Sequence, residues 1–359
     1  MELVTNWNRI QQRVEAWWNG TLDKGPLVAV YAPLHEPRRP LLEVSAPSDL
    51  RQQWLDVDYR VKAGWNEIMC IWCGGDAVPS FFVNLGPGSI AGYLGSEFTL
   101  KPDTVWFHPL EDNALEHIEE TLAYDPDNEL WVVTQDIARE AARLADGDFF
   151  VSIPDIGGAF DILASLRGNQ NLLVDLIESP ELVHRCQDKI LQLWFRYYTE
   201  LKSILDAAGQ EGYTCWMPCW SSRPWYALQC DFSAMISPDM FAEFALPYLR
   251  EQAEWLDRCI YHLDGPRALP HLDQLLSIEK LDAIQWVAGE GNPPEDSDHW
   301  LPYYRRIAEA GKGIGIMATD PDRIFDLSQR LPAQRLAFMI LLPNQKEGEA
   351  FLHRFQLDH

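Results

Sequence analysis

Basic side chains are scarce in this chain. Its 359 residues include 29 Lys and Arg against 54 Asp and Glu, which gives a formal net charge of −25. Nucleic-acid binding draws its affinity from clustered basic side chains that face the phosphates. The charge balance therefore excludes nucleic acid as the expected partner.

Long apolar runs are also missing. No stretch approaches the roughly 18 consecutive apolar residues of a membrane helix, and residues 1–12 lack the charged and apolar regions of a signal peptide. The cysteine count is seven, an odd number that suits a reducing compartment. We therefore expect a cytoplasmic protein with free thiols and no membrane partner. Cys70 and Cys73 have the spacing of a zinc or redox motif, but their neighbours are apolar, so buried thiols are the favoured interpretation.

Nucleotide-binding glycine motifs do not occur in the sequence. No Gly-x-Gly-x-x-Gly follows an early strand and no Walker motif appears. Short apolar runs bounded by turn residues are present instead, at Leu27–Ala32, Phe149–Ile153, Ile260–Leu263, Ala283–Val287, Ile314–Ala318 and Leu336–Leu342. Strands that alternate with helices pair in parallel, because each return to the sheet needs a crossover. This pattern favours a barrel over a dinucleotide-binding doubly wound sheet.

Three helix starts share one form, a capping side chain followed by proline and an acid. They begin at Ser179, Ser237 and Asp320. Behind the first, apolar residues recur at three- and four-residue steps over residues 182–204 and the pattern stops at Gly209, which predicts a long amphipathic helix. We predict an α/β protein whose residues 1–359 form a single (β/α)₈ TIM-type barrel domain with an N-terminal extension.

His262 and Asp264 are the sharpest candidates for chemistry. Strand side chains alternate, so both project to one face of the Ile260–Leu263 strand, and Gly265-Pro266 ends the run. Active groups of a barrel gather at the carboxyl ends of its strands. The pair is therefore predicted to act as a metal ligand set or as a base with its orienting acid. The alternative is a purely structural role, in which the aspartate orients the histidine or caps the next helix.

A second concentration of thiols, indoles and one acid lies between residues 213 and 232. Trp216, Cys230 and Asp231 would share a pocket with His262 and Asp264 if these runs end strands. The 15 tryptophans suit a pocket that packs a sizeable organic ligand. The alternative, which is the better one for most of them, is that the tryptophans fill the core.

Further candidates lie near other strand ends. Gln285 and Trp286 sit late in the Ala283–Val287 strand as candidate substrate-binding residues, and Glu290 follows between two glycines as a secondary catalytic acid. Arg38 and its neighbour Arg39, in the loop after the first strand, offer a grip for a carboxylate or phosphate. An exposed turn glutamate and ordinary surface arginines are the competing interpretations.

Several of these segments together resemble the uroporphyrinogen decarboxylase superfamily, which includes the cobalamin-dependent methyltransferases. The resemblance rests on the order and spacing of Gly157–Asp161, of Asp231–Pro238 with Phe241 and Pro247-Tyr248, and of the His262–Gly265 block. It covers most of the chain and implies a distorted (β/α)₈ barrel. The arginine-rich substrate stretch of the decarboxylases is replaced here by residues 31–36, in which Tyr31 is a candidate substrate-binding residue.

The methyltransferase branch of that superfamily implies a zinc site of His-x-Cys with a second Cys after the last strand. His262 matches this pattern, but Asp264 stands at the first Cys position and no cysteine lies near Leu342. Zinc also accepts carboxylate ligands. Cys230, Asp231 and Glu290 are the candidates for a third ligand.

The resemblance implies three competing functions. The first is a methyltransferase-like enzyme that moves a methyl group between a small substrate and a corrinoid on a partner protein, with zinc as the possible metal. The second is a metal-independent decarboxylase or lyase that holds a carboxylated ligand through Arg38 or Arg39. The third is a non-catalytic binding barrel.

Overall fold

The computed structural model of the protein describes residues 3–217 and 219–357. Its largest sheet has seven strands in the order β2-β1-β11-β10-β9-β8-β7. These are β1 (Leu27–Pro33), β2 (Ile71–Gly75), β7 (Trp225–Gln229), β8 (Arg258–Asp264), β9 (Ala283–Val287), β10 (Gly313–Ala318) and β11 (Leu336–Leu341). Neighbouring strands are parallel, except that β2 runs antiparallel to β1.

Two smaller sheets complete the strand set. β3 (Ser80–Phe82) pairs in parallel with β6 (Phe150–Ser152), and β4 (Phe98–Leu100) forms an antiparallel hairpin with β5 (Val105–Phe107). A single parallel bridge joins Ile153 to Cys215. Over residues 3–217 and 219–357 these ladders do not join into one closed sheet. The mixed α/β class is confirmed, whereas the closed eight-stranded barrel stays a prediction.

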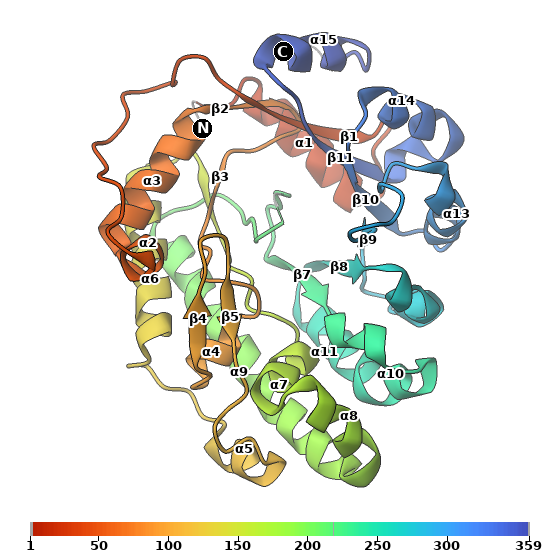
Figure 1. The fold of residues 1–359 in the computed structure, drawn as a ribbon. Helices are drawn as coiled ribbons and strands as arrows, with labels where there is room; N and C mark the ends of the chain where they lie inside the picture. Colours follow the sequence, from red (N-terminus) through yellow and green to blue (C-terminus); the bar gives the residue numbers. More distant parts are fainter. Residues whose placement is uncertain (1–2, 218, 358–359) are drawn as a thin grey trace.

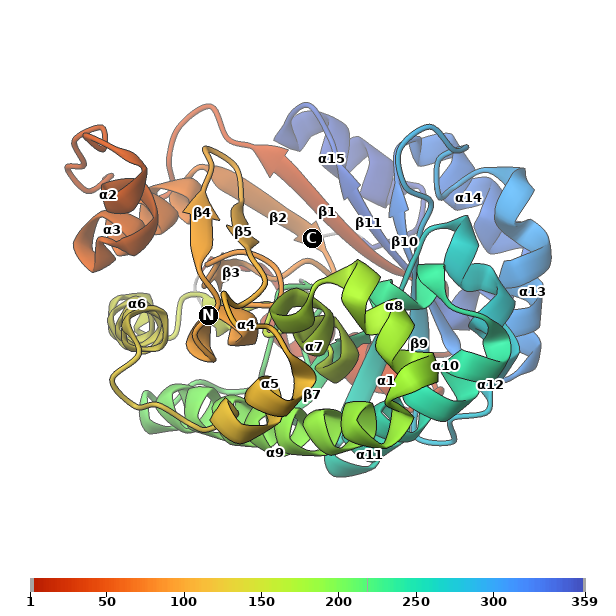
Figure 2. The same ribbon diagram turned by 60° about the horizontal axis from the view of Figure 1, so that its bottom comes forward.

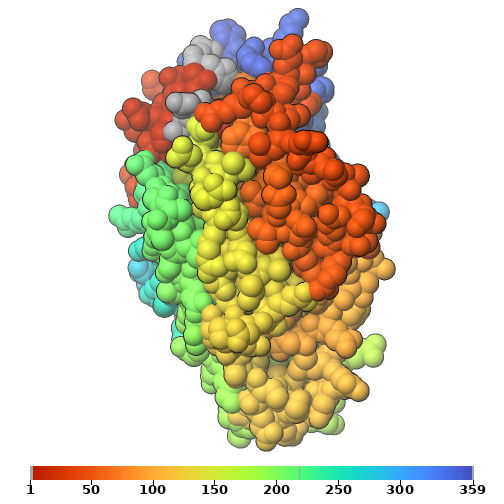
Figure 3. All heavy atoms as spheres, turned by 90° about the vertical axis from the view of Figure 1, so that its left-hand side faces the viewer, coloured from red at the N-terminus to blue at the C-terminus, as the bar shows by residue number. Residues whose placement is uncertain are grey.

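Helices lie on the outer side of the sheets. In Figure 1 the seven strands follow an arc, with α11, α13, α14 and α15 outside it. On another face α3, α6 and α9 lie side by side (Figure 3), and α6 packs against β6. The helices other than α1 are α2 (Leu50–Leu55), α3 (Val57–Met69), α4 (Ile90–Tyr93), α5 (Leu115–Thr121), α6 (Glu129–Ala145), α7 (Ala159–Arg167), α8 (Asn169–Glu178), α9 (Pro180–Ala207), α10 (Pro238–Phe244), α11 (Leu246–Trp255), α12 (Leu272–Leu276), α13 (Leu301–Glu309), α14 (Pro321–Arg330) and α15 (Gln345–His353).

The N-terminal helix α1 (Trp7–Trp18) covers the amino ends of the strands, and Figure 2 shows it behind the sheet. Its Glu15 forms an ion pair with Arg258, the first residue of β8. The Trp18 ring packs 5.3 Å from that of Trp225, the first residue of β7. α1 therefore closes one end of the strand array, and the carboxyl ends of the strands open on the opposite side.

The six strands expected from the apolar runs are confirmed, with ends that differ by at most two residues. The three proline-led helices are also present as α9, α10 and α14. Ser237 and Asp320 accept backbone N–H groups as predicted, but the Ser179 side chain makes no capping bond, so that detail of the prediction is wrong. Pro180 still starts α9 because the first helical residue needs no N–H partner.

The seven cysteines are all free. Cys73 is buried on β2 and Cys70 is half-buried at the end of α3, in agreement with the expected apolar surroundings. Within the described part of the chain, no helix has both the length and the apolar character that crossing a membrane requires.

Candidate functional site

Three polar side chains occupy neighbouring positions on three adjacent strands. Gln229 on β7 is in register with His262 on β8, which is in register with Gln285 on β9. Residues in register share a face of the sheet. β10 contributes Gly315 at the next position, where a Cβ atom would lie 3.3 Å from the Gln285 side chain. The small residue leaves room for the amide beside the histidine.

Asp231, His262 and Asp264 converge just beyond this row. One ligand atom from each of the three lies within 4.8 Å of those of the other two. Asp264 ends β8 two residues after His262, and Asp231 follows β7 at the same edge of the sheet. Both aspartates are exposed and the histidine is half-buried. The expected grouping of these three residues at the carboxyl ends of the strands is present.

Two neighbours orient the His262 ring. Nδ1 lies 2.5 Å from Oε1 of Gln285. Because a carbonyl oxygen only accepts hydrogen bonds, Nδ1 is the donor in this contact, and Nε2 is the ring nitrogen left to face another partner. The ring of Trp216 packs edge-on against the imidazole, with 5.1 Å between the ring centroids. This arrangement fixes the orientation of the ring and directs Nε2 away from Gln285.

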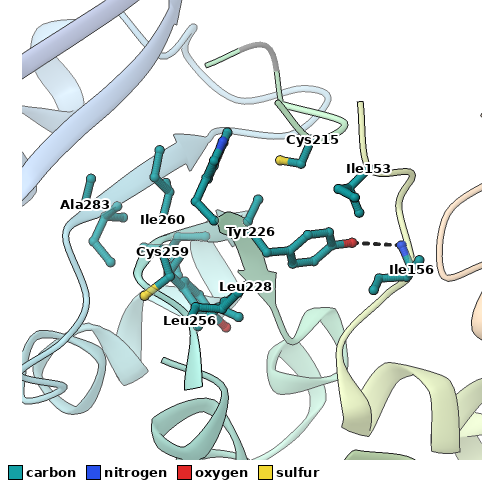
Figure 4. Packing of buried hydrophobic residues seen from close by; sticks show 14 of the residues in the cluster. Ile153, Ile156, Cys215, Tyr226, Leu228, Leu256, Cys259, Ile260 and Ala283 are labelled. Atoms are coloured by element: carbon teal, nitrogen blue, oxygen red, sulfur yellow. Dashed lines mark hydrogen bonds between the residues drawn. The ribbon is translucent and has the colours of Figure 1, made fainter. Parts of the chain in front are cut away.

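Asp155 is a site residue that the sequence analysis missed. It follows β6, and its carboxylate accepts hydrogen bonds from Gln229 (3.1 Å) and from the N–H of Gly157 (2.9 Å). The hydroxyl of Tyr226 on β7 accepts the N–H of Ile156, as Figure 4 shows, and donates to the carbonyl of Pro154. The backbone is thus held on both sides of Asp155. The sequence signal that could have identified Asp155 is its position, because it is an acid two residues after the predicted Phe149–Ile153 strand.

Electrostatics at the site favour protons or cations over added negative charge. Burial raises the pKa of Asp155 to about 6; hydrogen bonds from Gly157 and Gly88 oppose this shift, and the Asp231 charge adds to it. Asp231 keeps contact with solvent, but partial desolvation by the surrounding protein raises its pKa; His262 lowers this pKa and Asp264 raises it. Several carboxyl groups close together cannot all ionise without a compensating positive charge.

Asp161, in the first turn of α7, approaches the same edge from the helix layer. Its Oδ1 accepts the Phe232 N–H at 2.9 Å. Burial and the Asp231 charge raise its pKa. α7 comes this close because Gly158 has no side chain: a Cβ there would lie 2.1 Å from the Gln229 carbonyl oxygen.

A pocket of about 670 Å³ opens beside this cluster. Asp231 and Gln229 form its inner side, and Trp106 on β5 and Met235 lie at its outer side with exposed side chains. Pockets of this volume bind drug-sized organic molecules. The described residues that line it are Pro87, Gly88, Val105, Trp106, Phe107, Pro109, Asn113, Asp161, Ala164, Ser165, Arg167, Gly168, Asn169, Gln170, Asn171, Gln229, Asp231, Phe232 and Met235.

Three candidates from the sequence lie away from the cluster. Cys230 follows Gln229 in the chain and is buried against the helix layer, beside Phe160. Trp286 lies on the opposite face of β9 from Gln285, with its ring 4.7 Å from that of Trp300. Glu290 is exposed in the loop after β9 and does not belong to the three-residue cluster. Strand alternation explains the first two positions, because neighbours of an inward residue point outward.

Tyr31 on β1 and Arg38 in the loop after it lie toward the end of the seven-stranded sheet that is opposite β7. The Tyr31 hydroxyl donates to the Val78 carbonyl at 3.2 Å, and burial raises its pKa. Arg38 is half-buried in the loop after β1, and neither residue lines the 670 Å³ pocket. The neighbouring Arg39 forms an ion pair with Asp148. Substrate binding by Tyr31 and Arg38 stays a prediction.

No protein-family model and no curated protein sequence matches the chain. Among solved structures, a methyltransferase from Methanosarcina mazei is similar in fold, with a TM-score of 0.58. The alignment covers 97% of this chain and 98% of that chain at 12% sequence identity. The fold is therefore similar over nearly the full length of both proteins, whereas most of the amino acids differ.

Proposed function

We propose that this chain is a methyltransferase-like enzyme whose active centre is the cluster of Asp231, His262 and Asp264. The observation that carries the proposal is the convergence of these three donors at the carboxyl ends of the strands, with His262 oriented by Gln285. Support for the reaction class comes from the fold shared with the methyltransferase and from the sequence resemblance to the cobalamin-dependent branch. A corrinoid carried by a partner protein is the proposed methyl acceptor or donor.

The donor set fits a divalent cation, and zinc is the first candidate. Zinc accepts imidazole nitrogen and carboxylate oxygen, and catalytic sites use three protein ligands with one position left open. The hydrogen bond from Nδ1 of His262 to Gln285 is the kind of outer contact that fixes a metal-binding histidine. When bound, the cation would supply Lewis acidity toward a heteroatom of the substrate.

The ligand chemistry narrows the class of substrate atom. Asp264 stands where the resemblance would place a cysteine, so two carboxylates and one imidazole replace a thiolate-rich set. Carboxylates are hard donors and leave a bound cation better suited to oxygen or nitrogen than to sulfur. We therefore propose methyl transfer at an oxygen or nitrogen atom, with Asp155 and Gln229 flanking the cluster as positioning residues.

The proposal extends to the architecture. We propose that β3, β6 and the segment around Cys215 complete a distorted eight-stranded barrel with the seven-stranded sheet. Support comes from the bridge between Ile153 and Cys215, from the arc of strands in Figure 1, and from α1, which covers one end of the array. One barrel domain would then place the cluster at its open mouth, as in other barrel enzymes.

The metal-independent alternative finds less support. It relied on Arg38 or Arg39 to hold a carboxylated ligand, but Arg39 pairs with Asp148 and Arg38 does not line the pocket. The non-catalytic alternative predicts ligand binding without turnover. No observation favours either of them over the metal-assisted proposal.

The first test is metal content. Purified protein is loaded with Zn²⁺, freed of excess ion, and analysed by inductively coupled plasma mass spectrometry beside Asp231→Asn, His262→Ala and Asp264→Asn. We expect stoichiometric zinc in the parent protein and a loss in each variant, because each removes one of three ligands. Glu290→Gln is the matched control, since Glu290 is an exposed acid outside the cluster. Unchanged zinc in His262→Ala would overturn the metal proposal.

The second test is turnover. Methyl transfer from small methylated oxygen and nitrogen compounds to free cob(I)alamin is followed by absorbance. Alanine at position 262 provides neither a lone pair nor a proton, so the His262→Ala rate should fall by at least about 10²-fold. Circular dichroism must show an intact fold. A rate equal to that of the parent would place the chemistry elsewhere, and Glu290→Gln should again leave the rate unchanged.

A further inference from the structure

The 670 Å³ pocket beside Asp231 has an unusual charge balance. Among its described lining residues Arg167 is the only cationic side chain. Arg167 is fully engaged, because its Nε and Nη2 atoms donate to Asp175 and its Nη1 donates to Asn113. An anionic ligand would find no free positive side chain in this lining.

Carboxyl groups, by contrast, are present on the inner wall. Asp231 and Asp161 both line the pocket. The Oδ2 atom of Asp161 is buried and has no hydrogen-bond partner among the described residues. Burial without a partner disfavours the ionised form of this carboxyl group, and a positive ligand group nearby would favour that form. This oxygen is an observation independent of the three-residue cluster.

The outer wall is aromatic and apolar. The side chain of Trp106, on the β4–β5 hairpin, is 58% exposed, and that of Met235 is 41% exposed, although both are large and hydrophobic. Phe107 and Phe232 line the same pocket. Large exposed apolar side chains around one concavity mark a binding surface. Tryptophan faces also attract organic cations more strongly than other aromatic rings do.

We propose that this pocket binds an organic cation, such as a methylated ammonium group, between its acidic inner wall and the aromatic wall formed by Trp106, Phe107 and Phe232. The cation would sit next to Asp231 and so within reach of the active centre. The inference rests on the proposed function only in making this cation the methylated substrate. Binding itself requires no turnover and is tested without it.

The probes are choline and 3,3-dimethylbutan-1-ol. They have the same shape, but the alcohol has an uncharged carbon atom where choline has its quaternary nitrogen. Isothermal titration calorimetry of the purified full chain should show that choline binds at least about 10-fold more tightly than the neutral alcohol, because a desolvated cation–aromatic contact contributes that much. A further probe, 3,3-dimethylbutanoate, should not bind measurably. Equal affinity for choline and the neutral alcohol, or tighter binding of the carboxylate, would overturn the proposal.

Two variants locate the site. Trp106→Leu removes the exposed indole. Asp161→Asn removes the carboxyl group that a bound cation would ionise and keeps an acceptor for the Phe232 N–H. Each change should weaken choline binding by about 5- to 10-fold. Trp255→Leu is the control, because Trp255 is a 42% exposed tryptophan on α11 outside this pocket. Undiminished affinity in both pocket variants would refute the assignment. Choline binding that persists without methyl transfer would refute only the proposed function.

Discussion

At the scale of single residues, the site depends on which nitrogen of His262 is free. Gln285 decides this, because its Oε1 accepts the Nδ1 proton and its position on β9 is in register with His262. A glutamine in this role orients the imidazole without adding charge to a site that already contains Asp231 and Asp264.

Replacing Gln285 tests that role. Gln285→Leu removes the acceptor at similar volume, so His262 loses its fixed tautomer and zinc affinity should fall by about 10- to 100-fold. Gln285→Glu retains an acceptor and should keep affinity at or above that of the parent. Competition titration with a chromophoric chelator measures both. If leucine and glutamate gave the same affinity as glutamine, orientation by Gln285 would play no part.

Alternation along a strand was enough to predict that His262 and Asp264 share a face, because that rule concerns one strand only. The same rule places Cys230 and Trp286 on the opposite face from their neighbours Gln229 and Gln285, so neither of these two candidates joins the cluster. Asp155 lies beyond the end of its strand, where alternation no longer indicates the direction of a side chain.

At the scale of elements, the approach of α7 to β7 builds the inner wall of the pocket. Gly157 has φ +79° and Gly158 lies against the Gln229 carbonyl. These two residues turn the chain from Asp155 into α7 and bring Asp161 to the N–H of Phe232. The contact joins segments about 70 residues apart, so no local pattern predicts which glycine lacks room for a side chain.

The Gly158→Ala variant should therefore be strongly destabilised. A Cβ placed 2.1 Å from a backbone oxygen forces α7 or β7 to move, at a cost on the order of 2–3 kcal/mol. Urea unfolding measures the change. Gly209→Ala is the control, since Gly209 has φ +76° and open space around it, and should cost only about 1 kcal/mol of backbone strain. Equal losses in the two variants would contradict a steric role for Gly158.

At the scale of the whole molecule, α1 ties the start of the chain to strands far along it. Arg258, almost fully buried, pairs with Glu15 across 243 positions, and the Trp18 indole donates to the Trp220 carbonyl at 2.8 Å. Burial alone would raise the pKa of Glu15, but hydrogen bonds from Arg258 and Ser222 outweigh it and hold the pKa at about 2.

This pair makes stability depend on pH in a definite direction. The folded pKa of Glu15 lies below its ordinary value of 4.5, so the stabilisation is complete above pH 4.5 and is lost as the pH falls toward 2. Glu15→Gln should cost about 2–4 kcal/mol at pH 7, because it leaves Arg258 without its charged partner, and much less near pH 2.5. Urea unfolding at both pH values measures this, with Asp58→Asn, which breaks the exposed Lys62 pair, as the control. A Glu15→Gln penalty independent of pH would contradict the assignment.

The sequence by itself determined the α/β class, six of the strands, the proline-led helices and the pairing of His262 with Asp264. All of these follow from periodicity and capping, which act over a few residues. Only the tertiary structure decided that Asp231, rather than Cys230 or Glu290, completes the cluster, that Gln285 orients His262, and that Asp161 and Trp106 line the pocket beside it. These contacts depend on strand register and on how helices from distant parts of the chain approach the sheet. Burial of the whole core sets both, and no short segment encodes them.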